Sequence, residues 1–209
     1  MNRTTIVDAA LELLDEAGLD ALTVRRLAQR LDVKSPALYW HFRGKQELLD
    51  EVADRLRALQ DSGPPAPGED WPAWLRRRAR ERRSVLMAHR DSARLMAGTR
   101  IGRERLAAVD AELAVLVGFG FTPVRAVRAA TLVDHYVVGS VLERQADHRR
   151  HAGSGEAPPE DPERTLPTGA APVLAAALRE GGDPEGDAAF EEGLSMVVDG
   201  VAAALERDG

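Results

Sequence analysis

The stretch LTVRRLAQRLDVKSPALYWHFRGK, residues 22–45, decides the fold class of this chain. It holds six basic residues against one acidic residue, a local charge of +5, whereas the whole chain of 209 residues carries −6. The spacing of its apolar residues predicts two short helices joined by a tight turn. Because Lys and Arg neutralise phosphates, a small basic helix-turn-helix in an acidic protein indicates DNA binding confined to one patch.

Capping residues set the expected bounds of these two helices. Thr23 is the predicted N-cap of the first, and Ser35 is the predicted N-cap of the second. Pro36 then falls at the first helical position, where its missing N–H costs nothing. We expect the second helix to span about two turns and to end at Gly44.

The second helix has an unusual surface, because Tyr39, Trp40 and His41 are adjacent and cannot all face inward. A buried aromatic knot is one interpretation. The flanking basic residues favour the other, in which Tyr39 and Lys45 bond phosphates while neighbouring side chains approach base edges. The predicted DNA-contacting residues are Thr23, Arg25, Ser35, Pro36, Ala37, Tyr39, Trp40, His41 and Lys45.

Composition narrows the class of protein. A hydrophobic content of 44% with 30% charged residues is ordinary for a soluble globular chain. The absence of cysteine excludes disulfides and thiolate metal sites and is compatible with a reducing cytoplasm. No apolar run approaches the roughly 18 residues of a membrane span, and the N-terminal apolar region carries acids, unlike a signal peptide. We therefore expect a cytoplasmic protein without a membrane partner.

Apolar periodicity predicts helices throughout and no β-hairpin. The Pro- and Gly-rich segment 61–70 is a natural boundary between a DNA-binding domain at 1–60, with its connecting fourth helix, and a larger helical domain at 61–209. Residues 148–172 read as a mobile loop. The expected architecture is all-α, with helices at 2–17, within 22–45, and at 45–60, 71–89, 104–118, 123–147, 172–179 and 185–206.

A family resemblance follows from these motifs. The run NRTTIVDAALELLDEAGLDALTVRRLAQRLDVKSPALYWHFRGKQELLD, residues 2–50, resembles the N-terminal DNA-binding domain of the tetracycline-repressor (TetR) family. HRDSARLMAGTR, GFGFTPVRAV and VDHYVVGSVLERQ are similar to the effector-binding domain of its tetracycline-repressor subgroup. The resemblance implies a homodimeric, ligand-responsive repressor that binds a palindromic double-stranded DNA operator and is released by a small-molecule effector.

Two helical stretches carry small and branched residues that allow close helix approach. They lie at 126–142 and in the last helix, where Gly193, Met196 and Gly200 recur at helical spacing. An intramolecular core is one interpretation. The resemblance favours the other, a four-helix interface between two copies of the chain.

The resemblance also implies an effector site. Arg78 and Arg82 share a helix face with Trp74 and match pocket-lining positions of the subgroup. At two positions where that repressor presents histidines to the drug and its magnesium ion, this chain has Asp61 and Met96. Because a thioether is soft and Mg²⁺ is hard, the change argues against tetracycline as inducer. The predicted effector-binding residues are Asp61, Trp74, Arg78, Arg82, Met96, Thr99, Glu112, His135 and Glu143.

Arg78 and Arg82 need negatively charged partners, and the sequence leaves two alternatives for these partners. They pair with Asp61, Glu112 or Glu143 within the protein, or they await an anionic ligand, since an unpaired buried charge is costly. The second alternative predicts a mostly apolar, anionic effector that needs no Mg²⁺. The other arginines of RRRARERR (76–83) are expected on a solvated face.

Motifs of catalysis and metal binding are missing. HExxH, GxxxxGK and GxGxxG do not occur, so we expect no enzyme, no cofactor and no metal site. HRRH at 148–151 is interpreted as a solvated basic run rather than a metal site. Two rival functions stay open: an enzyme that uses a pocket of His135, Glu143 and Glu112, and a ligand-independent DNA-binding protein.

Overall fold

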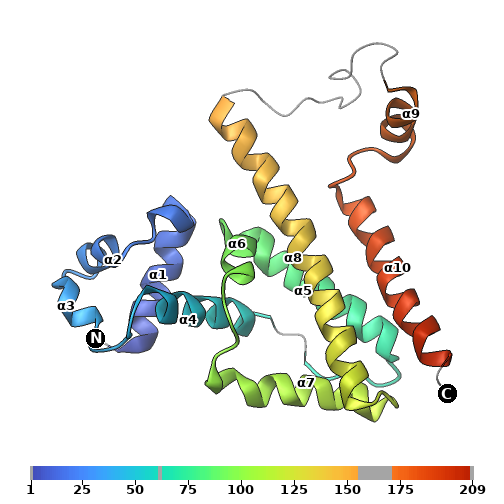
Figure 1. Cartoon of the computed structure of the whole chain (residues 1–209), viewed down its shortest axis with the longest axis horizontal. Coiled ribbons are helices and arrows are strands. Elements are labelled where there is room, and N and C mark those ends of the chain that lie inside the picture. Colours follow the sequence, from blue (N-terminus) through green and yellow to red (C-terminus); the bar gives the residue numbers. More distant parts are fainter. Residues whose placement is uncertain (1, 61–62, 155–170, 208–209) are drawn as a thin grey trace.

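The structure is a computed structural model that describes residues 2–60, 63–154 and 171–207, with side chains described to residue 150 in the second range. Throughout these ranges the regular structure is helical, with no strand, as the sequence predicts. Figure 1 shows α1–α4, here called the head, on one side and α5–α10, here called the body, on the other.

The head begins with α1 (Arg3–Ala17), which is capped at both ends. The side chain of Asn2 accepts from the Thr5 N–H at 2.8 Å, and Gly18 ends the helix with φ at 82°. The next helices are α2 (Val24–Arg30), α3 (Ser35–Leu38) and α4 (Lys45–Ala58). They enclose a small apolar core in which the following side chains are fully buried: Ile6, Ala10, Leu14, Leu27, Val52 and Leu56.

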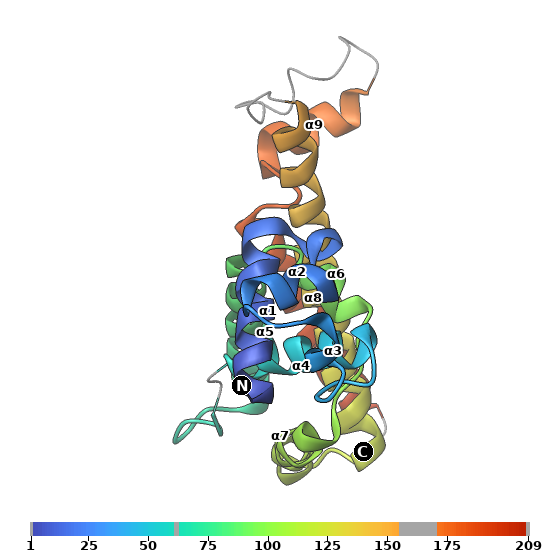
Figure 2. The same cartoon turned by 90° about the vertical axis from the view of Figure 1, so that its left-hand side faces the viewer.

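The body is arranged around α8 (Pro123–Ser154), which packs against α5 (Trp71–Ala88), α6 (Ser92–Ala97), α7 (Leu106–Gly118) and α10 (Asp187–Glu206). Figures 1 and 2 show α7 at one end of α8 and α9 (Pro172–Gly181) towards the other. α9 has no buried residue. The body core therefore lies between α5, α8 and α10.

Helix α8 is longer than the sequence predicts. It continues to Ser154, so the expectation of a loop from residue 148 is wrong for 148–154, and residues 155–170 of that loop lie outside the described part. One ion pair lies in the added turns, where Arg149 pairs with Asp91 at 2.8 Å. Just before them, Arg144 pairs with Asp183 at 2.6 Å. The HRRH segment is thus not simply a solvated basic run.

The arginines of 76–83 also differ from expectation. Arg76 contacts Asp199 at 2.6 Å, and Arg83 contacts Asp187 at 2.7 Å. Arg80 contacts Glu191 at 2.7 Å. The predicted solvated face holds for Arg80, which is exposed, but not for Arg76 and Arg83, which are partly buried where they join α5 to the acidic side of α10.

Most of the face predicted for dimerisation on α8 is used inside the chain. Ala126, Val133, Val137 and Val141 are buried in the body core. Gly193 of α10 lies against the ring of Tyr136, where a Cβ atom would collide with the hydroxyl group. The interpretation of an intramolecular core is therefore correct for these positions.

Within the described residues, no single helix is long and apolar enough to cross a membrane. The segments 103–118 and 123–150 meet that criterion only as a pair, and they are bent by 112° relative to each other.

Candidate DNA-binding surface and effector cavity

The turn between α2 and α3 presents the basic surface of the head. Thr23 caps α2 as predicted, with its Oγ1 accepting from the Arg26 N–H at 3.2 Å. The chain then reverses at Asp32, whose backbone adopts a left-handed conformation with φ at 51°. Arg25 and Lys45 are both exposed at this surface.

Two details of α3 depart from the sequence interpretation. Lys34 is the N-cap, without a side-chain hydrogen bond, and Ser35 is already the first helical residue. The helix ends at Leu38 after four residues instead of two turns. Its short length follows from Leu38 and Phe42, which turn inward and are buried where the chain enters α4.

The aromatic cluster points outward. Trp40 is 89% exposed and Tyr39 is 58% exposed, so the buried aromatic knot is wrong. His41 is half-buried, and its carbonyl oxygen accepts from Arg3 Nη1 at 2.6 Å. An apolar ring as exposed as that of Trp40 is unusual without a partner. Ser35 and Ala37 are half-buried, and Pro36 is exposed beside them.

A cavity of about 850 Å³ lies where the body meets α4, between α4, α5, α7 and α8. Most of the residues predicted for the effector line it together, although they come from distant parts of the sequence. The predicted residues in its wall are Trp74, Arg78, Arg82, Met96, Thr99, Glu112 and His135.

Two predicted members are not in this wall. Asp61 lies outside the described residues. Glu143 lines a separate hollow of about 350 Å³ between α8 and the segment 184–190, which it shares with His135. The structure therefore does not gather His135, Glu143 and Glu112 into one acid–base pocket.

The cavity wall is rich in arginine. Arg78 Nη2 lies 2.6 Å from Glu112 Oε2, and its guanidinium stacks 4.8 Å from the centre of the Trp74 ring. This pairing with Glu112 is one that the sequence analysis proposed. Arg82 pairs instead with Asp134, a partner that the sequence analysis did not name.

Sequence reasoning also missed Arg57, Arg100 and Arg105, which line the same cavity. With Arg78 and Arg82 they place five guanidinium groups in the wall, against the carboxylates of Glu112 and Asp134. Arg57 follows the apolar Ala53 by four residues on an amphipathic helix, and this spacing places both on the same helix face. The wall thus carries an excess of positive charge.

Burial affects these arginines directly. It lowers the pKa of the Arg82 guanidinium, an effect increased by the nearby Arg57 and Arg78 and opposed by Asp134 and Glu112. The Nε atoms of Arg82 and Arg105 and the Nε2 atom of Gln60 are buried, with no hydrogen-bond partner among the described residues. A buried donor without an acceptor costs about 1–3 kcal/mol, so these three groups destabilise this part of the wall.

Hydrogen bonds connect the cavity wall to α4, the last helix of the head. Asp54 accepts from the Gly102 N–H at 2.8 Å and pairs with Arg57 at 2.8 Å. Arg105 donates to the carbonyl oxygen of Arg57 at 3.0 Å. One turn earlier, Asp50 accepts from the Arg100 N–H at 3.2 Å. A movement of the segment 98–105 would therefore be transmitted to α4 through these hydrogen bonds.

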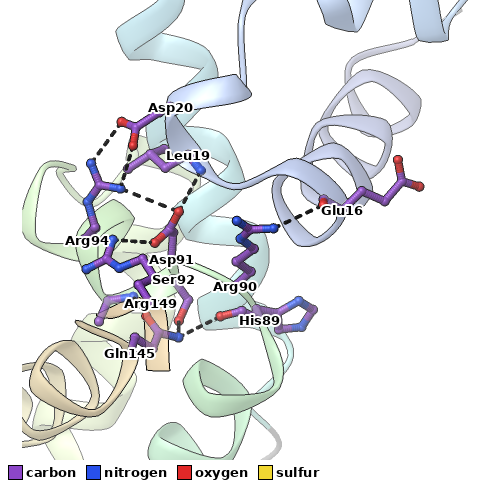
Figure 3. Close-up of polar contacts among 11 residues, drawn as sticks. Glu16, Leu19, Asp20, His89, Arg90, Asp91, Ser92, Arg94, Gln145 and Arg149 are labelled. Carbon is purple, nitrogen blue, oxygen red and sulfur yellow. Dashed lines mark hydrogen bonds and ion pairs between the residues drawn. The ribbon is translucent and has the colours of Figure 1, made fainter. Parts of the chain in front are cut away.

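A second junction joins the head to α6 and α8 (Figure 3). Asp91 is 5% exposed and has a left-handed backbone, with φ at 54°. Its carboxylate pairs with Arg149 at 2.8 Å, and Arg94 pairs with Asp20 of the head at 3.0 Å. The side-chain amide of Gln145 donates to the His89 carbonyl oxygen at 2.8 Å, which fixes the turn before α6.

Comparison with known proteins identifies the family to which this chain is similar. Residues 6–52 match the family model described as "Bacterial regulatory proteins, tetR family". Residues 64–205 match the one described as "Tetracyclin repressor-like, C-terminal domain". The tetracycline repressor protein class A from transposon 1721 of Escherichia coli is 42% identical over 202 residues, covering 95% of this chain and 89% of that protein. The class G repressor of Vibrio anguillarum is 40% identical over 215 residues, covering 100% of this chain and 99% of that protein.

A solved structure shares the fold along the chain. It is TetR class A in complex with 5a,6-anhydrotetracycline and magnesium, which is 38% identical with a TM-score of 0.71 over 97% of this chain and 99% of that one. The helical head, the cavity in the body and both family matches lead to one conclusion. This chain belongs to the TetR family of ligand-responsive transcriptional repressors.

Proposed function

We propose that two copies of this chain bind a palindromic DNA operator through the surface at residues 23–45 and leave it when a small molecule fills the body cavity. The observation that carries this proposal is the pairing of a basic, aromatic head surface with a cavity whose wall is bonded to the head. Neither rival function uses both features. An acid–base enzyme would need Glu143 beside Glu112, and a ligand-independent DNA-binding protein would need no cavity.

The head surface supports DNA contact by its chemistry. Lys45 is the first residue of α4 and is exposed, and Tyr39, six residues earlier, is also exposed. The ammonium group of Lys45 and the hydroxyl group of Tyr39 both suit phosphate oxygens. Arg25 lies in the first turn of α2, and the exposed ring of Trp40 suits a base edge or a thymine methyl group.

Exposed residues on α8 and α10 support the dimer. Leu132 is 48% exposed and Met196 is 64% exposed, and Gly200 has open space around it in the single chain. Apolar side chains left outside the core by two long helices suit a symmetric contact with the same helices of a second copy. Such symmetry implies a palindromic operator.

The cavity supports an effector that is not bound through magnesium. Met96 is 6% exposed and lines the cavity, and its thioether is a poor ligand for a hard cation. Among the described residues, no group of three or more His, Asp or Glu side chains is arranged to hold a metal ion. These residues do not fit the magnesium complex named for the class A relative.

Effector binding would act through α4. A ligand that contacts Thr99, Arg100 or Arg105 changes the segment 98–105, whose N–H groups are held by Asp50 and Asp54. Because α4 packs directly on α1, moving α4 changes the separation of the two heads of a dimer. Ligand binding then favours dimers in which the separation of the two heads does not match the spacing of successive major grooves.

The direct test is fluorescence anisotropy with the labelled DNA upstream of the chain's own gene, measured at several salt concentrations and with candidate ligands. The proposal predicts tight, salt-dependent binding to one palindromic segment and release by a ligand that raises the melting temperature of the protein. Equal affinity for this DNA and for scrambled DNA would overturn it.

A further inference from the structure

The arginines of the cavity wall do more than neutralise the carboxylates within the protein. Five arginines and two carboxylates line the cavity, and buried Nε donors of Arg82 and Arg105 meet no acceptor among the described residues. Glu112 is shared by Arg78 at 2.6 Å and Arg105 at 3.9 Å, so it satisfies the second of these only weakly. Even with Asp54 paired to Arg57 and the Arg57 carbonyl oxygen accepting from Arg105, the wall has more guanidinium groups than carboxylates.

The remaining wall is mostly apolar, and the planar guanidinium of Arg78 lies over the Trp74 ring. Trp74 is almost fully buried, and Arg78 covers one side of its ring. Met96, Leu113, Leu116 and Val138 add aliphatic and thioether surface around it. A planar apolar body would pack against this part of the wall, while an acceptor group at its edge would meet the arginines.

We propose that the cavity selects a planar aromatic or polycyclic effector bearing a carboxylate or enolate-type anion, which Arg82 and Arg105 bind directly without a metal ion. Guanidinium groups present several N–H donors in one plane, and this geometry fits a two-oxygen anion. The proposal rests on the proposed function only in treating the cavity as the effector site.

The carboxylate of Asp134 competes with an anionic ligand for Arg82. It pairs with Arg82, so an incoming anion must share or replace that contact. Removing the negative charge of Asp134 should therefore strengthen anion binding, whereas removing the positive charge of Arg82 should weaken it. Opposite effects from the two partners of one ion pair would not arise from a general loss of folding.

The experiment uses matched pairs of neutral and anionic probes with the full-length protein. Naphthalene-, anthracene- and pyrene-carboxylates are compared with their carboxamides by isothermal titration calorimetry in magnesium-free buffer with EDTA. We expect at least one acid to bind about tenfold or more tightly than its amide, the factor expected from one charge-assisted hydrogen bond. Equal binding within every pair, including no binding at all, would overturn the proposal.

Substitutions in the cavity wall test where the anionic group of the ligand binds. The preference for the acid should fall to near unity in Arg82→Met or in Arg105→Met and should rise in Asp134→Asn. Arg80→Met is the matched control, because Arg80 lies on the same helix as Arg82 but is half exposed, pairs with Glu191 and does not line the cavity. A preference that survives in both Arg82→Met and Arg105→Met, or that falls in Asp134→Asn, would contradict the assignment.

The operator assay separates this inference from the proposed function. If the acids bind with the expected preference but the protein does not bind operator DNA, the proposed function fails and the anion site stands. If operator DNA is bound and is released by the amides as readily as by the acids, the repressor function stands and the anion site fails.

Discussion

The buried carboxylate of Asp91 accepts a hydrogen bond from the backbone N–H of Leu19 at 3.0 Å, and this contact ties α6 of the body to the head (Figure 3). Gly18 lies directly against the Asp91 carboxylate and has a backbone, with φ at 82°, that other residues rarely adopt. Because Asp91 also holds Arg149 of α8, one carboxylate connects three parts of the molecule.

Asp91→Ala should lower the free energy of unfolding by about 2–4 kcal/mol, since it leaves the Leu19 N–H unpaired and places alanine in a left-handed backbone. Asp91→Asn should cost less, because asparagine tolerates this conformation and keeps an acceptor oxygen. Chemical denaturation of the two variants measures the difference. Asp187→Ala, which alters an exposed ion pair, should change stability little. Equal losses for Ala and Asn would contradict the assigned role.

Lys45→Ala and Arg25→Ala should weaken DNA binding in different ways. Loss of a phosphate contact at Lys45 should reduce affinity for all sequences and lower the salt slope by about one unit. Loss of a base contact at Arg25 should instead relax discrimination at one base pair, costing roughly 1–3 kcal/mol. Anisotropy titrations on operator and scrambled DNA distinguish the two effects. Wild-type binding by both variants would refute the assignment.

Gly200→Glu should produce a monomer that folds normally and binds the operator poorly. A Cβ atom at Gly200 meets nothing within 4 Å in the single chain, so the substitution disturbs only a contact with a second copy. Gly181→Glu is the matched control, since that glycine of α9 also has open space around it. Sedimentation velocity at micromolar concentration measures the assembly. A monomeric wild-type protein would end the dimer proposal.

Operator release should persist in EDTA. Met96 cannot replace a histidine as a magnesium ligand, and the carboxylates of Glu112 and Asp134 in the wall are already paired with Arg78 and Arg82. The measurement is ligand-induced release of labelled operator with EDTA or with added Mg²⁺, with Arg82→Ala expected to weaken release. Release by a tetracycline only when Mg²⁺ is present would show that the character of Met96 does not decide the effector.

The protein should lose stability as the pH falls from about 4.5 towards 2, and Glu69 should contribute to that loss. Hydrogen bonds from Arg77 and from the Ala66 N–H lower the pKa of Glu69 to about 2. Because the unfolded chain binds this proton more readily, the contribution is fully present above the unfolded pKa and disappears as the pH falls through the folded one. Glu69→Gln should reduce the slope of stability against pH in this window. An unchanged slope would contradict the contribution.

Features that depend on neighbouring residues were predictable from the sequence. Thr23 caps α2, Gly18 ends α1, and the basic excess of residues 22–45 marks the exposed surface of the head. Each depends on residues a few positions apart, where hydrogen-bond geometry and helical periodicity act without help from the rest of the fold. The four-residue length of α3 was not predictable, because Phe42 turns inward and is buried with its ring against Arg3 of α1, far away in the sequence.

The tertiary structure alone decided which charges meet. The sequence indicated that Arg82 needs an acidic partner, but only the packing of α5 on α8 selected Asp134, 52 positions away. Contacts between α4 and the segment 98–105 placed Arg57 and Arg105 in the cavity, and the contact of α6 with the head brought Asp91 to Leu19. Long charged side chains have many partners within reach in an unfolded chain, and the choice among them is made by the positions of the helices that carry them.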